Sequence, residues 1–384
     1  MFEKKIDKRL LKNFDFIILL IIFLLVGIGI LGIGIAKRLP TEGGENLIEA
    51  IRNLNVYHVR LQFLWFLSGL VLMAVVISID YHIIGDYVDY IYWIVVALLL
   101  YVDVAGAIMG GAQSWIPIGP FALQPSEFAK ISIILTFAKV LSKKGDEGIN
   151  HIKDLIPILL RLALPLVLIL SQPDFGTAAV FIVILFGMLF VSNISYKLLF
   201  GIIGSGVAII PVVWFALLSE VQKDRIRVFL NPELDPTGKG YQVSQSITAI
   251  GSGRIIGKGI LTNNTLSQLN FLPAAHTDFI FAVLTEAFGF VGGIVIIGLY
   301  LFLIIRTIMI AVKAKDKFGS LIVIGVAALM IAHIFENIGM TMGLTPVTGI
   351  PLPFMSYGGS FMWTNMIAYG LVLNIGMRRQ KIKF

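Results

Sequence analysis

Stretches with few or no charged residues recur along the whole chain, and each has about the length of a membrane-spanning helix. Five of them contain no formal charge: 16–36, 61–79, 175–192, 198–219 and 361–377. A helix of roughly 20 apolar residues crosses the ~30 Å hydrocarbon layer of a bilayer. The pattern therefore predicts an all-α protein that crosses the membrane several times.

Five further stretches fit a span only if an ionisable side chain lies inside it. They are 87–108 with Asp103, 121–142 with Glu127 and Lys130, 155–171 with Arg161, 279–305 with Glu286, and 318–342 with His333 and Glu336. The total is about ten predicted spans. An ionisable group in hydrocarbon costs several kcal/mol unless it is paired or meets water, so these side chains are candidates for function.

Composition supports a membrane protein. Hydrophobic residues make up 57% of the 384 residues and charged residues only 14%, with a mean hydropathy of +0.91; soluble domains have about 25% charged residues. The net charge of +7 is also compatible with nucleic-acid binding. However, the Lys and Arg residues lie in short runs beside the spans and form no separate basic domain, so we expect no nucleic-acid partner.

The basic residues predict the orientation of the chain. With the N-terminus inside, 18 of the 30 Lys and Arg residues fall in inside segments and 10 in outside segments. Cytoplasmic loops carry an excess of Lys and Arg, so both termini are predicted to be cytoplasmic. The first span lacks an A-x-A cleavage site and is expected to remain as an anchor, within one membrane domain over 1–384. The chain has no cysteine, so disulfides and thiolate metal sites are excluded.

One predicted outer segment is unusually long. Residues 220–277, between the seventh and eighth predicted spans, are rich in Gly, Asn, Pro and Ser. Loops of this length are usually functional or disordered. We expect a folded extracytoplasmic cap that leads to Asp278.

An acid lies where this segment meets the next span. In FLPAAHTDFIFAVLTEAFG, residues 271–289, His276, Thr277 and Asp278 precede an apolar run that contains Glu286. A helix cap would explain Asp278 simply. A cap, however, needs no long exterior approach, and a carboxylate at a membrane boundary can act as a general base on a substrate hydroxyl.

Two other motifs place charges within or beside spans. In QPSEFAK, Glu127 and Lys130 are three residues apart and share a helix face, so they are expected to pair, either for structure or for function. In SQPDFGT, Asp174 follows Pro173 at the outer end of a span. Because acids are favourable at helix N-termini, a cap is an equally good explanation of Asp174.

Two outer segments carry further candidates. Trp115, in GAQSWIPIGPFALQPSE, lies between two spans, where Trp either anchors the membrane interface or stacks on a sugar or an isoprenoid. The segment 343–360 is rich in proline and glycine and includes Ser356 and Tyr357. Irregular backbone at membrane depth is tolerated only where it is buried or lines a wet cavity.

Several blocks in order resemble the shape, elongation, division and sporulation (SEDS) family. They are QPSEFAK, SQPDFGT, NPELDPTGKGYQVSQSITAIGSG, FLPAAHTDFIFAVLTEAFG and PVTGIPLPFMSYGGS. The resemblance runs from about residue 14 to 378 and is greatest to the elongation branch. The ten spans and cytoplasmic termini also agree with that family.

The resemblance implies a peptidoglycan glycosyltransferase on the outer face of the bacterial cytoplasmic membrane. Its substrate would be lipid II, its product a β-1,4 glycan formed with inversion, and its essential acid Asp278. The other matching positions would line or support the cavity: Trp115, Glu127, Lys130, Asp174, His276, Thr277, Glu286, Ser356 and Tyr357.

For the leaving pyrophosphate, the resemblance implies a divalent cation, Mg²⁺ or Mn²⁺, with Lys130 as a further candidate. The sequence has no metal-ligand spacing of its own. The family often has Glu within the tetrapeptide PAAH and a second acid after Glu286, where this chain has Ala274, Ala275 and Ala287. These differences weaken any scheme that spreads metal binding over neighbouring carboxylates.

The resemblance also implies a partner, a class B penicillin-binding protein with transpeptidase activity, within the elongation machinery and surrounded by membrane lipid. Two other functions are considered: a transporter that flips lipid II, and a scaffold that recruits cell-wall enzymes. A transporter needs a path to both membrane faces, and a scaffold needs no buried charges. Division- and sporulation-specific members share the same motifs.

Overall fold

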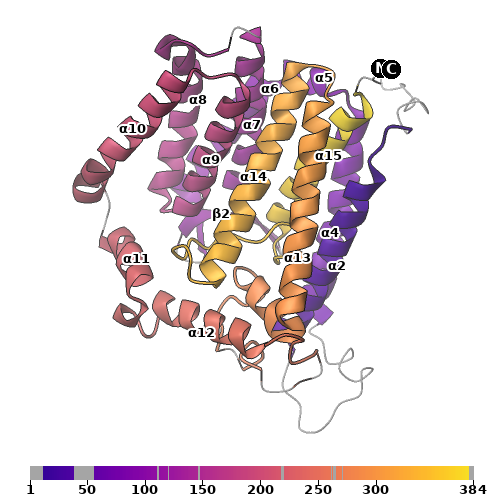
Figure 1. Ribbon diagram of the computed structural model, residues 1–384, viewed down its shortest axis with the longest axis vertical. Helices are drawn as coiled ribbons and strands as arrows, with labels where there is room; N and C mark the ends of the chain where they lie inside the picture. The colour runs from indigo at the N-terminus through magenta and orange to yellow at the C-terminus, as the bar shows by residue number, and fades with distance from the viewer. Residues whose placement is uncertain are drawn as a thin grey trace.

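The computed structural model describes residues 12–38, 56–109, 112–119, 121–145, 148–217, 220–260, 262, 265–269 and 271–379. Parts of the predicted inner and outer segments, including most of 37–60, lie outside these ranges. Within them the chain is mostly helical. Figure 1 shows the long helices running side by side, with α11 and α12 at one end of the bundle.

The long helices have the following bounds: α2 Phe16–Ala36, α4 Val56–Ser78, α6 Val88–Ala105, α7 Pro125–Ser142, α8 Ile152–Ser171, α9 Phe175–Val191, α10 Tyr196–Val212, α13 Ile280–Val312, α14 Lys317–Thr341 and α15 Gly359–Met377. The shorter helices are α5 Tyr81–Asp86, the π-helix η2 Val213–Leu217, α11 Glu220–Leu230, the 3₁₀-helix η3 Pro232–Leu234 and α12 Lys239–Ser252.

Each predicted span overlaps one of the ten long helices. By length and composition, seven helices of the described chain are suited to cross a membrane: α2, α4, α6, α8, α10 continued by η2, α13 and α14. Helix α9 is apolar but has only 17 residues. The chain is thus a multi-pass helical membrane protein, and the count of ten spans stays a prediction.

Both ends of the helical bundle can be assigned from described contacts. The Asn13 side chain, just before α2, donates to the carbonyl of Met377 at the end of α15 over 3.5 Å. The start of α2 and the end of α15 therefore lie on the same side of the molecule. Ion pairs gather there as well, including Arg306 with Asp15 at 2.6 Å and Arg378 with Asp80 at 3.2 Å. We call this the inner end and the opposite one, which holds Asp278, the outer end.

The connection between α6 and α7 corrects the all-α prediction. It forms a three-stranded antiparallel sheet of β1 Ala107–Met109, β2 Ala112–Ile118 and β3 Phe121–Leu123, in the order β1-β2-β3. The span predicted over 121–142 consequently begins at Pro125, because residues 121–123 pair with β2. Pro125 lies in the first turn of α7, where its missing N–H costs nothing.

Helix α13 is longer than the predicted span 279–305. Its 33 residues are interrupted at Gly289, which has φ of +69°. A Cβ at Gly289 would lie 2.3 Å from the nitrogen of Gly257, so the outer segment packs directly against this break. The two turns before Gly289 therefore belong structurally to the outer end.

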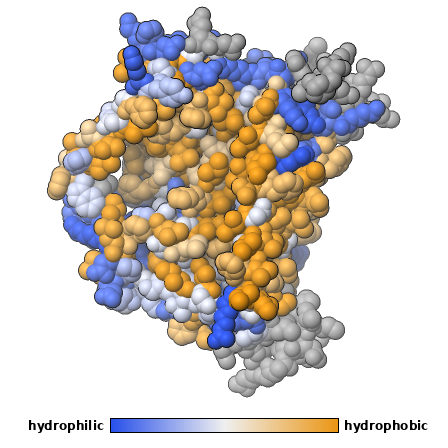
Figure 2. All heavy atoms as spheres, in the orientation of Figure 1, coloured by the Kyte–Doolittle hydropathy of each residue, from blue (hydrophilic) through white to orange (hydrophobic). Residues whose placement is uncertain are grey.

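Helix α10 is the least packed of the long helices. None of its residues is buried. Only its first turns, at Leu198, Leu199 and Ile202, pack against the core. Figure 2 shows that this face is hollowed between α10 and the bundle, at the height of the apolar side chains that cover the middle of the molecule.

Candidate functional site

Asp278 lies at the outer end, immediately before α13, and its side chain is half-buried. Burial raises its pKa to about 6, although the Thr277 hydroxyl and the charge of Lys239 act in the opposite direction. Its Oδ2 faces Gly349, where a Cβ would lie 3.5 Å away. A carboxylate with such a pKa is ionised at neutral pH and is still basic enough to accept a proton.

Three consecutive carbonyls hold the backbone at Asp278. The carbonyl of His276 accepts from the N–H of Tyr357 at 3.0 Å, and that of Thr277 accepts from Oγ of Ser356 at 2.5 Å. The carbonyl of Asp278 itself accepts from Nδ2 of Asn337 at 2.8 Å. We call these three hydrogen bonds the carbonyl clamp. It fixes the position of the acid relative to α14 and the loop before α15.

The clamp gives the predicted residues Ser356 and Tyr357 a positioning role. Oγ of Ser356 also accepts from the N–H of Leu352 at 2.8 Å, and Gln62 on α4 donates to the Ser356 carbonyl at 3.0 Å. The ring of Tyr357 contacts that of His276, with centroids 5.4 Å apart. His276 is half-buried; burial, helped by nearby Lys37 and His58, lowers its pKa to about 4, so it is neutral at pH 7.

Sequence reasoning missed Asn337. Its side chain is fully buried in α14, and Nδ2 donates to the carbonyls of both Asp278 and Ile350, the latter at 2.7 Å. An uncharged amide within an apolar span was the available signal, because such a group is costly there without partners.

Replacing Asn337 by Leu should reduce glycosyl transfer while the acid itself remains. Leu has a similar volume but cannot donate to either carbonyl, so the loop before α13 loses one point of the clamp. A misplacement of about 1 Å can cost a reaction roughly 100-fold. We expect a fall of at least tenfold in turnover, measured as glycan formed per minute. Asn365→Leu on α15 is the matched control, because it removes a buried amide whose Nδ2 donates to the Phe361 carbonyl of its own helix; an equal loss there would indicate a general packing effect.

Glu127 and Lys130 form the predicted pair, and His333 joins them. Nζ of Lys130 lies 2.7 Å from Oε1 of Glu127 and 3.0 Å from Nε2 of His333. All three side chains are buried in the outer half of the bundle. Glu336, three positions after His333 in α14, forms no ion pair with it among the described residues. Instead, Nδ1 of His333 contacts the carbonyl of Pro351 at 3.3 Å, next to the Ile350 carbonyl that Asn337 holds.

The buried network and the clamp therefore meet on the loop before α15. Lys130 and Glu127 act on this loop through His333, and Asn337 connects the same loop to Asp278. Lys130 is 1% exposed and already has two partners. In this arrangement it supports the loop and is not open to a phosphate group.

Glu286 is separate from this network. Its carboxylate accepts from Nζ of Lys258 at 2.7 Å, from the N–H of Leu266 at 3.0 Å, and from Oγ and N–H of Ser267 at 2.6 and 3.3 Å. These bonds attach the outer segment to α13. The structure thus uses Glu286 to hold the segment and does not bring its carboxylate to Asp278.

Asp174 and Trp115 also have local partners. Asp174 caps α9, with Oδ1 accepting from the N–H of Thr177 at 3.0 Å and Oδ2 from its hydroxyl at 2.8 Å. The cap explanation therefore accounts for its hydrogen bonds. Trp115 is half-buried in β2, opposite Ala107 of β1.

A pocket at the outer end carries two positive charges. It lies between α11, α12 and the loop after α14, and Arg225 and Lys239 are among its lining residues. Lys239 is close enough to Asp278 for each charge to influence the other. Neither cation stands out in the sequence.

The described residues offer no ready site for the predicted divalent cation. Among them, no three His, Asp or Glu side chains are grouped as metal ligands. The charge of Lys239 lowers the pKa of Asp278, and a positive charge so placed repels a metal cation. The described residues around Asp278 therefore do not fit a metal site built by the protein alone.

The fold and the site define a class: a multi-pass helical membrane protein with one positioned carboxylate at its outer end. Comparison with known proteins identifies the family. The profile of the cell cycle protein family that groups FtsW, RodA and SpoVE matches residues 18–381. The chain therefore belongs to this family, which confirms the resemblance seen in the sequence.

Named relatives cover most of the chain. The peptidoglycan glycosyltransferase MrdB of Escherichia coli is 40% identical over 314 residues, 82% of this chain and 84% of the relative. The peptidoglycan glycosyltransferase RodA of Treponema pallidum is 34% identical, with 97% and 99% covered. Stage V sporulation protein E of Bacillus subtilis is 36% identical, with 80% and 83% covered.

Solved structures share the fold. One chain from a study of how a peptidoglycan synthase complex coordinates polymerization and crosslinking has a TM-score of 0.78 at 27% identity, covering 95% of this chain and 98% of that one. The rod shape determining protein RodA of Thermus thermophilus has a TM-score of 0.68 at 24% identity, covering 96% and 98%. At that identity the second likeness supports the fold alone.

Proposed function

We infer that this chain is a peptidoglycan glycosyltransferase that polymerises lipid II into glycan strands for cell elongation. The relatives named peptidoglycan glycosyltransferases support the activity, with 34 to 40% identity over most of the chain. The observation that carries the mechanism is Asp278, held by three consecutive backbone hydrogen bonds and given a pKa of about 6.

In the proposed reaction Asp278 is the general base. A carboxylate oxygen of Asp278 accepts the proton of the acceptor 4-hydroxyl while the oxygen of that hydroxyl attacks the anomeric carbon of the donor. The new glycosidic C–O bond forms as the bond from the anomeric carbon to the lipid pyrophosphate breaks, and the pyrophosphate leaves with the electron pair. One direct displacement converts an α-linked donor into a β-1,4 linkage. A positioned base typically contributes 10²- to 10⁴-fold to such a rate.

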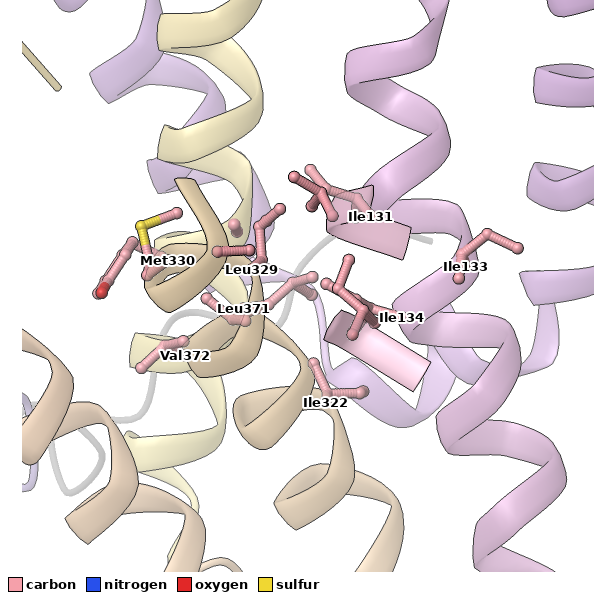
Figure 3. Close-up of a cluster of buried hydrophobic side chains, with 14 of the residues drawn as sticks. Ile131, Ile133, Ile134, Ile322, Leu329, Met330, Leu371 and Val372 are labelled. Carbon is pink, nitrogen blue, oxygen red and sulfur yellow. The ribbon is translucent and has the colours of Figure 1, made fainter. Parts of the chain in front are cut away.

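The interior argues against a lipid II transporter. Below Lys130, the space between α7, α14 and α15 is filled by buried apolar side chains (Figure 3): Ile131, Ile134, Ile322, Leu329, Met330, Leu371 and Val372. The polar network lies in the outer half of the bundle. A transporter needs a polar path to both faces, whereas a polymerase needs one site on the outer side.

The hollow beside α10 suits a lipid-linked substrate. The helix has no buried residue, and Figure 2 shows apolar side chains on both sides of the hollow, those of α10 on one side and those of the bundle on the other. A prenyl chain could enter there from the bilayer while the sugars remain at the polar outer end near Asp278. We propose that this outer end faces away from the cytoplasm across the bacterial cytoplasmic membrane, with both termini inside.

A transpeptidase partner is proposed on the same basis. The chain resembles one from a peptidoglycan synthase complex, and glycan strands must be crosslinked after polymerisation. A class B penicillin-binding protein of the elongation machinery would supply that step. A role in division or sporulation is the second candidate, because Stage V sporulation protein E is 36% identical.

A reconstitution assay tests the proposed function. The protein is purified with its cognate transpeptidase and given lipid II with Mg²⁺ or Mn²⁺, and glycan strands are separated by gel electrophoresis. We expect strands of many disaccharides. In parallel, fluorescent lipid II is followed across the bilayer of liposomes that contain the protein. Transfer across the bilayer without any glycan would replace the polymerase with a transporter.

A further inference from the structure

The pocket near Asp278 combines positive charge with apolar walls. Arg225 comes from α11 and Lys239 from the first turn of α12. The remaining lining is mainly apolar and comes from both helices and the loop after α14: Val228, Phe229, Val243, Ile247 and Val347. Such a surface is suited to a ligand with an anionic group joined to a hydrocarbon chain.

The two cations have no counter-ion at contact distance. Among the described residues, no carboxylate lies within the 4.0 Å limit for an ion pair with either side chain. Arg225 stacks over the ring of Phe175, 6.0 Å from its centroid, and its Nε is buried without a hydrogen-bond partner. Burial, and after it the neighbouring Arg225, lowers the pKa of Lys239 to about 8, although Asp235 and Asp278 act in the opposite direction.

Three acids influence the two cations: Asp174 acts on Arg225, and Asp235 and Asp278 act on Lys239. Asp174 already caps α9. The two oxygens of Asp235 accept from the N–H groups of Gly238 at 2.9 Å and Lys239 at 2.7 Å, where they cap the start of α12. Asp278 is the proposed base. The backbone at the start of α12 is therefore satisfied, and an anion in the pocket would be met by the Arg225 and Lys239 side chains.

We propose that this pocket binds the diphosphate of the prenyl-linked donor, with Arg225 and Lys239 neutralising it and the apolar wall holding the first prenyl units. The assignment rests on the proposed function and replaces Lys130, whose ammonium group is enclosed by Glu127 and His333. Hydrogen bonds between an ammonium or guanidinium group and phosphate are among the strongest in proteins. As the glycosyl bond breaks, negative charge grows on this same diphosphate, so the two cations also stabilise the leaving group.

The position beside Asp278 fits an in-line displacement. The base and the leaving group must act on opposite sides of one anomeric carbon. Lys239 is near enough to Asp278 for the two charges to influence each other, so a diphosphate held by Lys239 would lie in the neighbourhood of the base. The same interaction keeps the Asp278 pKa from rising further.

Direct binding tests the proposal. The complete protein in detergent is titrated with undecaprenyl pyrophosphate, and with undecaprenol as the uncharged control, using microscale thermophoresis. Arg225→Met and Lys239→Met should each raise the Kd for undecaprenyl pyrophosphate at least tenfold and leave the Kd for undecaprenol unchanged. Arg227→Met is the matched control on the same helix, because that side chain is half-exposed and pairs with Asp224 at 2.8 Å. It should behave as wild type.

A second measurement separates ligand binding from folding. Removing one of two neighbouring cations relieves repulsion, so both pocket variants should melt at or above the wild-type temperature. Unchanged binding of undecaprenyl pyrophosphate in both variants would overturn the proposal, as would an equal loss of undecaprenol binding. Excess inorganic pyrophosphate should compete only weakly, since it lacks the prenyl chain; equally strong binding of inorganic pyrophosphate would show a site for the free anion and overturn the prenyl assignment.

A third variant separates failure of the diphosphate site from failure of the proposed polymerase function. Asp278→Asn removes the base but leaves the two cations, so it should bind undecaprenyl pyrophosphate at least as well as wild type. If the protein makes no glycan but Arg225→Met and Lys239→Met still weaken the binding of undecaprenyl pyrophosphate, the diphosphate site is supported and the polymerase function is not. If glycan forms but the two variants bind undecaprenyl pyrophosphate as tightly as wild type, the polymerase function is supported and the diphosphate binds elsewhere.

Discussion

Asp278→Asn is expected to lower the rate of glycan formation by about 10²- to 10⁴-fold, the usual contribution of a general base. Asn has nearly the shape of Asp, and the carbonyl clamp uses only backbone atoms of residues 276–278. The fold should therefore persist while the group that accepts the proton is lost. The measurement is the initial rate of glycan formation by the complex at saturating lipid II, with the melting temperature as the check on folding.

The pH dependence of the same assay gives an independent readout. The base acts in its ionised form, and burial raises the pKa of Asp278 to about 6. The wild-type rate should therefore rise with pH through about 6 and level off above it. The residual rate of Asp278→Asn should lack that rise. Retention of more than a tenth of the activity, or an unchanged pH profile in the variant, would remove Asp278 from the role of base.

Lys130→Met is expected to have the largest effect on stability. The Lys130–Glu127 distance is 2.7 Å, and the two side chains are 2% and 5% exposed. Removing one member of a buried pair leaves the other charge without compensation and typically costs about 3–5 kcal/mol. The free energy of unfolding, measured by titration with SDS in mixed micelles, should fall by this amount. Glycan formation should fall as well, because His333 loses its contact with Lys130.

A double variant identifies the cause of this loss. Glu127→Gln combined with Lys130→Met removes both charges, so it should be clearly more stable than Lys130→Met alone. Lys143→Met at the inner end of α7 is the control, since that lysine is exposed and should change stability little. If the double variant is as unstable as the single one, packing and not the buried charge is responsible.

The positions of the helices were largely predictable from the sequence. Within hydrocarbon the backbone must satisfy its own hydrogen bonds, so a long apolar run becomes a helix whatever surrounds it. For that reason each predicted span overlaps a helix in the structure. The exceptions arise at the ends: residues 121–123 are apolar enough for a span but pair as a strand, and α13 continues beyond its predicted end.

The candidate site was predictable in part, because a few polar groups stand out in an apolar sequence. Asp278, the Glu127–Lys130 pair, Ser356 and Tyr357 were all singled out there, and the structure connects them through one loop. Glu286 was grouped with Asp278 because the two are close in sequence. Its carboxylate instead binds Lys258 and Ser267 in the outer segment.

What the sequence by itself determined is where the chain becomes helical and which of its residues are too polar for their surroundings. The tertiary structure alone decided which of these residues meet. His333 contacts Lys130 on another helix and not Glu336 on its own, Asn337 reaches the carbonyl of Asp278 fifty-nine positions away, and Arg225 and Lys239 converge from two separate helices. The physical reason is that hydropathy and helix formation depend on neighbouring residues, whereas these contacts depend on how each helix is rotated and packed against the others.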